Sequence, residues 1–178
     1  MRCWRTFDFE KKYGFNKIVV FSLLVMFFVF SFLYVSLANW FSSPINSQHF
    51  FWFLVGCLIL YPVHKVLHLI PLFRYVPNLK VQAQIRCLCL PVFCINCKEP
   101  VSKKRFITSL LFPFLIITPL LIGASLIFPS YIHYFSLLTA IHTGICAIDF
   151  MYLKALASSP KYCFIEEHTE GYEILIPQ

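Results

Sequence analysis

Four long runs of apolar residues, almost free of charge, constrain this chain more than any other feature. They cover about residues 18–38, 50–72, 106–128 and 132–153. A helix needs about 20 apolar residues to cross the hydrocarbon core of a bilayer, and each run reaches that length. Only 13% of the 178 residues are charged, whereas about a quarter is usual in a soluble domain. The sequence therefore predicts an α-helical multi-pass membrane protein with four transmembrane helices, folded as a single membrane domain over residues 1–178.

The basic residues indicate how the chain is oriented. Of fifteen Lys and Arg, five precede the first run, seven lie between the second and third, and two follow the fourth. Cytoplasmic loops are enriched in Lys and Arg, so we predict a cell-membrane protein with both termini and the 73–105 loop in the cytoplasm. No basic stripe with exposed aromatic residues occurs, so the net charge of +7 does not indicate a nucleic-acid partner. The first run exceeds the core of a signal peptide, although Ser36-Leu37-Ala38 leaves cleavage open as an alternative.

Two segments outside the runs have the period of β-strands. Apolar and polar residues alternate from Val81 to Cys89, and a short apolar stretch follows Pro91. This pattern predicts a small cytoplasmic β-hairpin or sheet element over residues 79–97. A second alternating pair around Gly171 predicts a C-terminal hairpin over residues 162–177.

The second run contains His64 and His68, which lie one helical turn apart and therefore share a helix face. This spacing matches the two zinc ligands of the zincin motif, but Lys65 stands where that motif has an acidic residue. Apart from Lys65, the only charged residue within the four runs is Asp149. At about 1.5 Å per residue, all three candidate ligands lie about 21–27 Å from the same membrane face. Two imidazoles and a carboxylate at one depth predict a metal site with a fourth position for water.

Other interpretations of these residues stay open. Lys65 and Asp149 form an ion pair in one of them, with the histidines as polar packing. His142 lies about 10 Å from Asp149 along the helix axis, which predicts a core histidine rather than a ligand of the same ion. Cys146 is predicted to be a small apolar filler or a spare ligand. Four thiols of the basic loop resemble a zinc knuckle, namely Cys87, Cys89, Cys94 and Cys97.

With these motifs in view, the chain resembles the putative zincin peptidase family of small multi-pass bacterial membrane proteins, which is similar to the site-2 proteases. Three segments carry the resemblance beside the H-K-V-L-H motif: C-K-E-P-V-S-K-K-R-F (Cys97–Phe106), G-I-C-A-I-D (Gly144–Asp149) and G-Y-E-I-L-I-P (Gly171–Pro177). The resemblance implies that His64, His68 and Asp149 bind zinc. It also implies that the strand region holds an extended membrane-protein or peptide segment by strand addition.

Lys65 departs from the family pattern, because the catalytic Glu of the motif belongs at its position. We therefore predict a degenerate, non-catalytic metallopeptidase homologue with a zinc site and no catalytic residue. One alternative is an active intramembrane peptidase with a displaced base, for which Glu99, Glu166 and Glu167 are candidates. Another is a metal-free structural or regulatory membrane protein.

Overall fold

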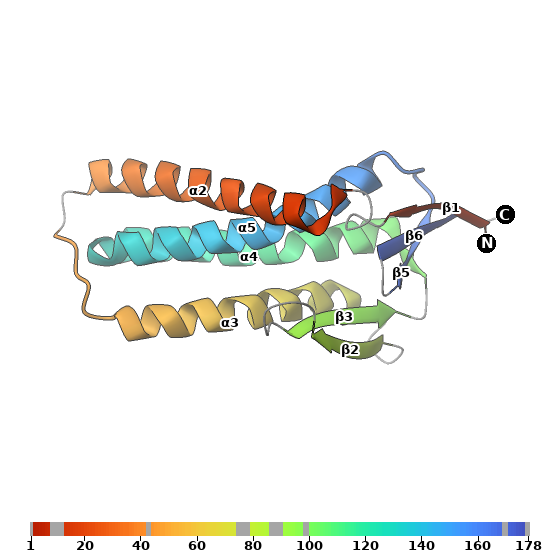
Figure 1. Cartoon of the computed structure of the whole chain (residues 1–178), viewed down its shortest axis with the longest axis horizontal. Coiled ribbons are helices and arrows are strands. Elements are labelled where there is room, and N and C mark those ends of the chain that lie inside the picture. Colours follow the sequence, from red (N-terminus) through yellow and green to blue (C-terminus); the bar gives the residue numbers. More distant parts are fainter. Residues whose placement is uncertain are drawn as a thin grey trace.

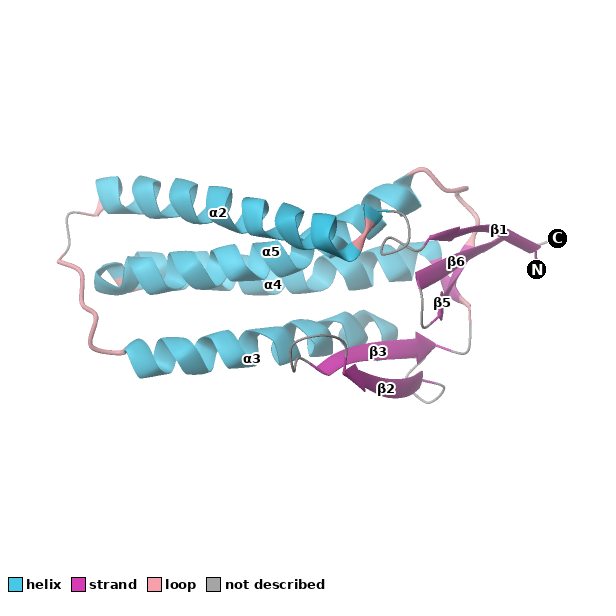
Figure 2. Cartoon of the chain, in the orientation of Figure 1, coloured by secondary structure: helices cyan, strands magenta, loops and turns pink. Residues whose placement is uncertain are grey.

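A computed structural model of the chain describes most of its residues. For residues 79–97, Glu167 and His168 it describes no side chains. The described residues are 2–7, 13–41, 44–73, 79–85, 91–97, 100–168 and 171–176. Four long helices form its body (Figures 1 and 2): α2 (Phe15–Trp40), α3 (Phe50–Leu69), α4 (Lys103–Ile127) and α5 (Ile132–Ala157). Each is long and apolar enough to cross a membrane, which confirms four membrane-length helices.

The central helix is α5, which packs against α2, α4 and α3. Gly144 allows the close approach of α2, because a Cβ atom there would lie 3.2 Å from the Ser22 carbonyl oxygen. In contrast, α2 buries only Ile18 and exposes large apolar side chains such as Phe28 and Phe32. An outward apolar surface of this kind is typical of a helix that contacts lipid.

One end of the bundle carries the strands and both chain termini (Figure 1). A four-stranded sheet has the order β1-β6-β5-β4, and all its pairs are antiparallel. Its strands are β1 (Arg2–Phe7), β4 (Val101–Ser102), β5 (Phe164–His168) and β6 (Gly171–Ile176). A separate hairpin consists of β2 (Leu79–Ile85) and β3 (Pro91–Cys97). The predicted small antiparallel element is confirmed, whereas the side of the membrane on which it lies stays a prediction.

Two apolar clusters fill the interior at different levels of α3. The cluster in the bundle includes Leu60 of α3 and Leu121 of α4. The cluster at the sheet end includes Leu72, which follows α3, and Ile174 of β6. His64 and His68 lie between Leu60 and Leu72 along the chain, so the polar residues of α3 interrupt an otherwise apolar interior.

Candidate metal centre

Five polar or sulfur side chains from two helices meet inside the bundle. The helix α3 contributes His64 and His68 from one face, and α5 contributes His142, Cys146 and Asp149. The α5 residues follow an i, i+4, i+7 spacing, which places them on one face of that helix. The exposed fractions of His64, His68 and His142 are 1%, 7% and 0%. Buried polar groups need partners, so the contacts within this cluster decide what it can hold.

The three residues predicted as metal ligands come together. His64 Nε2 lies 3.0 Å from His68 Nε2, and the Asp149 Oδ2 atom lies 3.3 Å from the first and 3.5 Å from the second. A tetrahedral ion with bonds of about 2.0–2.1 Å holds its ligand atoms about 3.3 Å apart. The three observed distances therefore fit one face of a tetrahedral zinc site.

The hydrogen bonds around His68 determine which of its nitrogens is free to bind a metal. His68 Nδ1 lies 2.8 Å from the Ser109 carbonyl oxygen, which can only accept a hydrogen bond. We therefore assign the proton of the neutral ring to Nδ1, which leaves a lone pair on Nε2. The Ser109 hydroxyl donates in return to the His68 carbonyl oxygen at 2.5 Å, so α3 and α4 are joined at this level.

His64 is oriented by a chain of two contacts that ends on α4. Its Nδ1 atom lies 3.3 Å from His142 Nε2, and His142 Nδ1 lies 3.1 Å from the Thr118 hydroxyl oxygen. If His142 donates to Thr118, its Nε2 accepts from His64 Nδ1, and the lone pair of His64 is then on Nε2. This assignment directs both Nε2 lone pairs at the Asp149 carboxylate.

Three acceptor atoms facing one another require a positive charge among them. Asp149 Oδ2 is buried and accepts no hydrogen bond from the described residues. A hydrogen bond between the two Nε2 atoms would need one ring to be protonated on both nitrogens. One bound cation satisfies all three lone pairs at once, so the buried oxygen and the two histidine tautomers fit a metal ion.

A second possible ligand set shares His64. Cys146 Sγ lies 3.6 Å from His142 Nε2 and 3.9 Å from His64 Nδ1, and the two nitrogens are 3.3 Å apart. His64 can serve either set, because its two ring nitrogens face different neighbours. The sequence prediction that separated His142 from Asp149 overlooked this contact with His64. The i, i+4, i+7 spacing of residues 142, 146 and 149 was the signal that could have revealed it.

Lys65, at the position of the missing acidic residue, does not enter the cluster. Its Nζ atom lies 6.0 Å from the centre of the Tyr61 ring, one turn back along α3. Among the described residues, the ion-pair contacts of Asp149 are to His64 and His68, and none is to Lys65. The interpretation of Lys65 and Asp149 as a buried ion pair is therefore not supported.

The remaining candidates lie elsewhere or outside the described part of the chain. Glu166 lies on β5 and pairs in register with Glu173 of β6, in the terminal sheet. Three of the candidate residues have no described side chain in this structure: Glu167, Cys94 and Cys97. Glu99, Cys87 and Cys89 lie outside the described residues altogether.

A bundle of four membrane-length helices around a buried His/Asp cluster defines a helical membrane-type protein with a candidate metal centre. The model of the family described as "Putative zincin peptidase" matches residues 57–164, and the chain belongs to this family. The matched range contains every residue of the cluster. No curated protein and no solved structure matches the chain.

Proposed function

We propose that the protein is a zinc-binding membrane protein of the zincin type that does not hydrolyse peptides. One observation carries this proposal: the three ligand atoms have the geometry of a zinc site, but a lysine, Lys65, stands at the position of the general base. The Nε2 atoms of His64 and His68 and a carboxylate oxygen of Asp149 lie within 3.5 Å of one another. These residues would hold the ion, with the Ser109 carbonyl and His142 fixing the histidine tautomers.

Zinc in such a position would act as a Lewis acid on a carbonyl group of a bound substrate. Hydrolysis also needs a group that removes a proton from the attacking water. Asp149 is the only carboxylate that the described side chains place at the cluster, and its role there is that of a ligand. Lys65 accepts a proton only when neutral, and its amine is directed at Tyr61. The cluster therefore supports metal binding better than proteolysis.

The metal site is tested by the zinc content of the purified protein. We expect about one zinc per chain in the wild type and none in the His64→Ala/His68→Ala variant, because both imidazole ligands are removed. His49→Ala is the matched control, since His49 is an exposed histidine at the other end of α3. Equal zinc in the double variant and the wild type would refute the proposed site.

A cleavage assay separates the degenerate protein from an active peptidase, which the family description favours as the second candidate. Zinc-dependent cleavage of a membrane substrate by the wild type, lost in His64→Ala, would establish the active peptidase. If the base is missing, Lys65→Glu restores the acidic residue of the motif. We expect that variant to acquire chelator-sensitive cleavage while the wild type shows none.

We further infer that the bilayer surrounds the four helices, in the cell membrane, with both termini in the cytoplasm. A partner would be an extended membrane-protein or peptide segment bound by strand addition. The support for this partner is that β2 is paired only with β3 among the described strands, so its other edge can accept a strand. Crosslinking from a photoreactive residue in β2 to a neighbouring protein would test it, and labelling of lipid alone would argue against it.

A further inference from the structure

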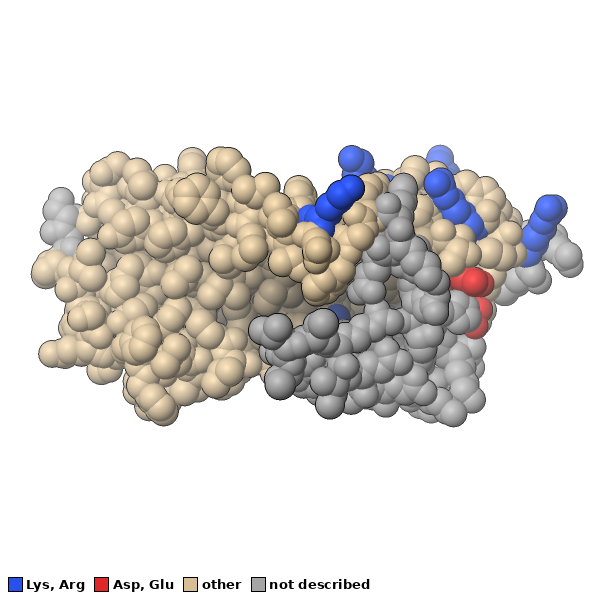
Figure 3. Space-filling view, viewed as in Figure 1, with Lys and Arg blue, Asp and Glu red and all other residues tan. Residues whose placement is uncertain are grey.

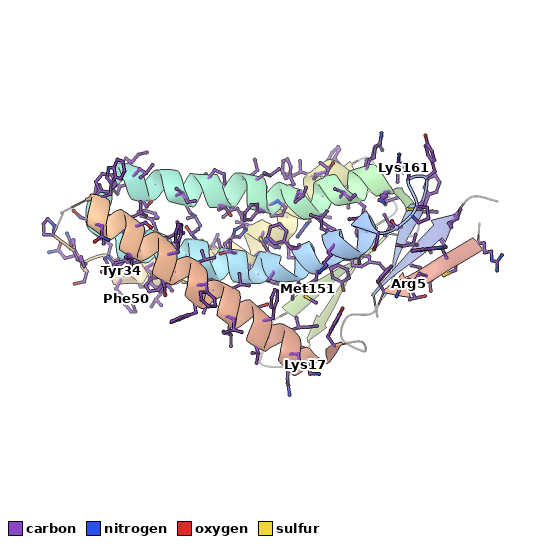
Figure 4. All side chains as sticks on the ribbon, turned by 90° about the horizontal axis from the view of Figure 1, so that it is seen from above. Arg5, Lys17, Tyr34, Phe50, Met151 and Lys161 are labelled. Carbon is purple, nitrogen blue, oxygen red and sulfur yellow. The ribbon has the colours of Figure 1, made fainter. Side chains whose placement is uncertain are left out.

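The sheet end of the bundle contains a half-open hollow of about 450 Å³ between β1, α2 and α5. Its size lies within the range of about 300–1,000 Å³ that is usual for small-molecule sites. Arg5 of β1, Lys17 of α2 and Met151 of α5 all line it, and Figure 4 shows these three residues around the same region. The hollow is distinct from the His/Asp cluster, because the two share no residue.

Three cationic side chains line the hollow: Arg5, Lys17 and Lys154. No acidic residue is among its described lining residues. No carboxylate among the described residues lies within ion-pairing distance of Lys17 or Lys154. The Arg5 guanidinium lies 5.0 Å from the centre of the Phe7 ring, which holds this charge beside the hollow. A concave region with three cations and no neutralising carboxylate among the residues that the structure describes attracts an anion.

Apart from Tyr13 and Ser158, the rest of the lining is apolar. Phe7 and Ile18 are buried, and Met151 is half-buried. An inorganic anion would leave this apolar wall without a partner. A ligand that carries a negative group at one end and hydrocarbon at the other satisfies both kinds of lining.

The position along the helices indicates where such a ligand comes from. Lys17 lies in the first turn of α2, and residues 18–38 that follow carry no charge. Lys154 lies in the last turn of α5. On the face seen in Figure 3, the charged side chains gather at this end of the bundle, and the opposite end shows none. Basic residues at the ends of membrane helices lie at the level of the lipid head groups.

We propose that this hollow is a binding site for an anionic phospholipid. Arg5, Lys17 and Lys154 contact the phosphate-bearing head group, and Phe7, Ile18 and Met151 contact the first carbons of the acyl chains. The site is separate from the zinc proposal, because none of its described lining residues belongs to the His/Asp cluster. A protein without zinc would still bind the lipid.

The test measures lipid binding to the full-length protein in a neutral detergent by native mass spectrometry, with phosphatidylglycerol as the probe. In Lys17→Gln/Lys154→Gln we expect the affinity to fall about 25-fold, at about fivefold for each lysine near an anionic head group. Lys161→Gln is the matched control, because it removes an equal charge from an exposed lysine on the other side of this end (Figure 4). That variant should bind phosphatidylglycerol as the wild type does.

Two further probes identify the ligand. Phosphatidylcholine should bind much more weakly than phosphatidylglycerol, and inorganic phosphate should not displace the bound lipid. Equal affinity in the double variant and the Lys161→Gln control would overturn the site. Equal binding of the two lipids would refute the requirement for an anionic head group. Displacement of the lipid by inorganic phosphate would refute the proposal that the ligand is a lipid. The folding control for the double variant is its circular dichroism spectrum and its zinc content, which should both match those of the wild type.

Discussion

Polar groups lie in two contrasting environments in this molecule. In the interior of the bundle, His64 is buried and its nitrogens lie 3.0–3.3 Å from three other polar atoms. At the sheet end, Lys17 and Lys154 are exposed and no described carboxylate pairs with them. The first region is defined by the positions and tautomers of a few atoms. The second is defined by an excess of one sign of charge beside an apolar wall.

This difference predicts two kinds of sensitivity. A buried site with fixed ligand atoms should respond strongly to the loss of one atom and weakly to salt, because little solvent reaches it. A site at the head-group level should respond to the number of charges and to ionic strength. The predictions below test this difference in sensitivity.

Asp149→Asn should have the largest effect, because it removes the only charged ligand of the cluster and changes little of its volume. Structural zinc sites contribute about 10–16 kcal/mol in total, so one of four ligands accounts for roughly 3 kcal/mol, or about a hundredfold in affinity. Competition with a chelator measures this loss. Phosphatidylglycerol binding should stay at the wild-type level. Unchanged zinc affinity would exclude Asp149 as a ligand.

His142→Phe should have a smaller effect, because His142 acts on the metal through His64. The phenyl ring fills a similar volume but cannot accept the hydrogen bond from His64 Nδ1 at 3.3 Å. Loss of a residue that orients a metal-binding histidine typically costs 10–100-fold in metal affinity, and we expect about tenfold here. Zinc competition measures the change, and lipid binding again serves as the reference.

Cys146→Ser distinguishes the two ligand sets that share His64. If the metal lies among His64, His68 and Asp149, the thiol is a neighbour and zinc affinity should change by less than about threefold. If the metal lies among His64, His142 and Cys146, this substitution should abolish binding. Cobalt substitution adds a spectroscopic check, since a thiolate-to-cobalt absorption band would establish the second set.

Several features of the fold were predictable from the sequence because they depend on quantities read along the chain. Apolar length predicts the four membrane-length helices. The i, i+4 spacing and the rise per residue place His64, His68 and Asp149 at one depth, and their ligand atoms lie within 3.5 Å. That they bind zinc stays a prediction.

Contacts between segments that are distant in the sequence were not predictable in this way. Residues 2–7 were interpreted only as part of a basic flank, yet they form β1 and pair with β6 near the other end of the chain. A comparison of depths along the helix axes also leaves out the size of the side chains. The two ring nitrogens of His64 lie on different sides of the imidazole, so His64 contacts both Asp149 and His142. The hollow at the sheet end was not predicted either. Arg5 and Phe7 line it, and they belong to β1, a strand that was not predicted from the sequence.

Ionic strength should have little effect on the zinc site and should produce the most direct contrast between the two regions. Raising the salt concentration from 0.1 M to 1 M shortens the screening length from about 10 Å to about 3 Å. The exposed lysines of the hollow then attract a head group less, so we expect phosphatidylglycerol affinity to fall about fivefold. Zinc affinity should change by less than about twofold, because the described ligand atoms are shielded from solvent by the bundle. A fall in zinc affinity as large as that for the lipid would mean that solvent ions reach the cluster. The contrast between a buried site of fixed geometry and an exposed site of net charge would then fail.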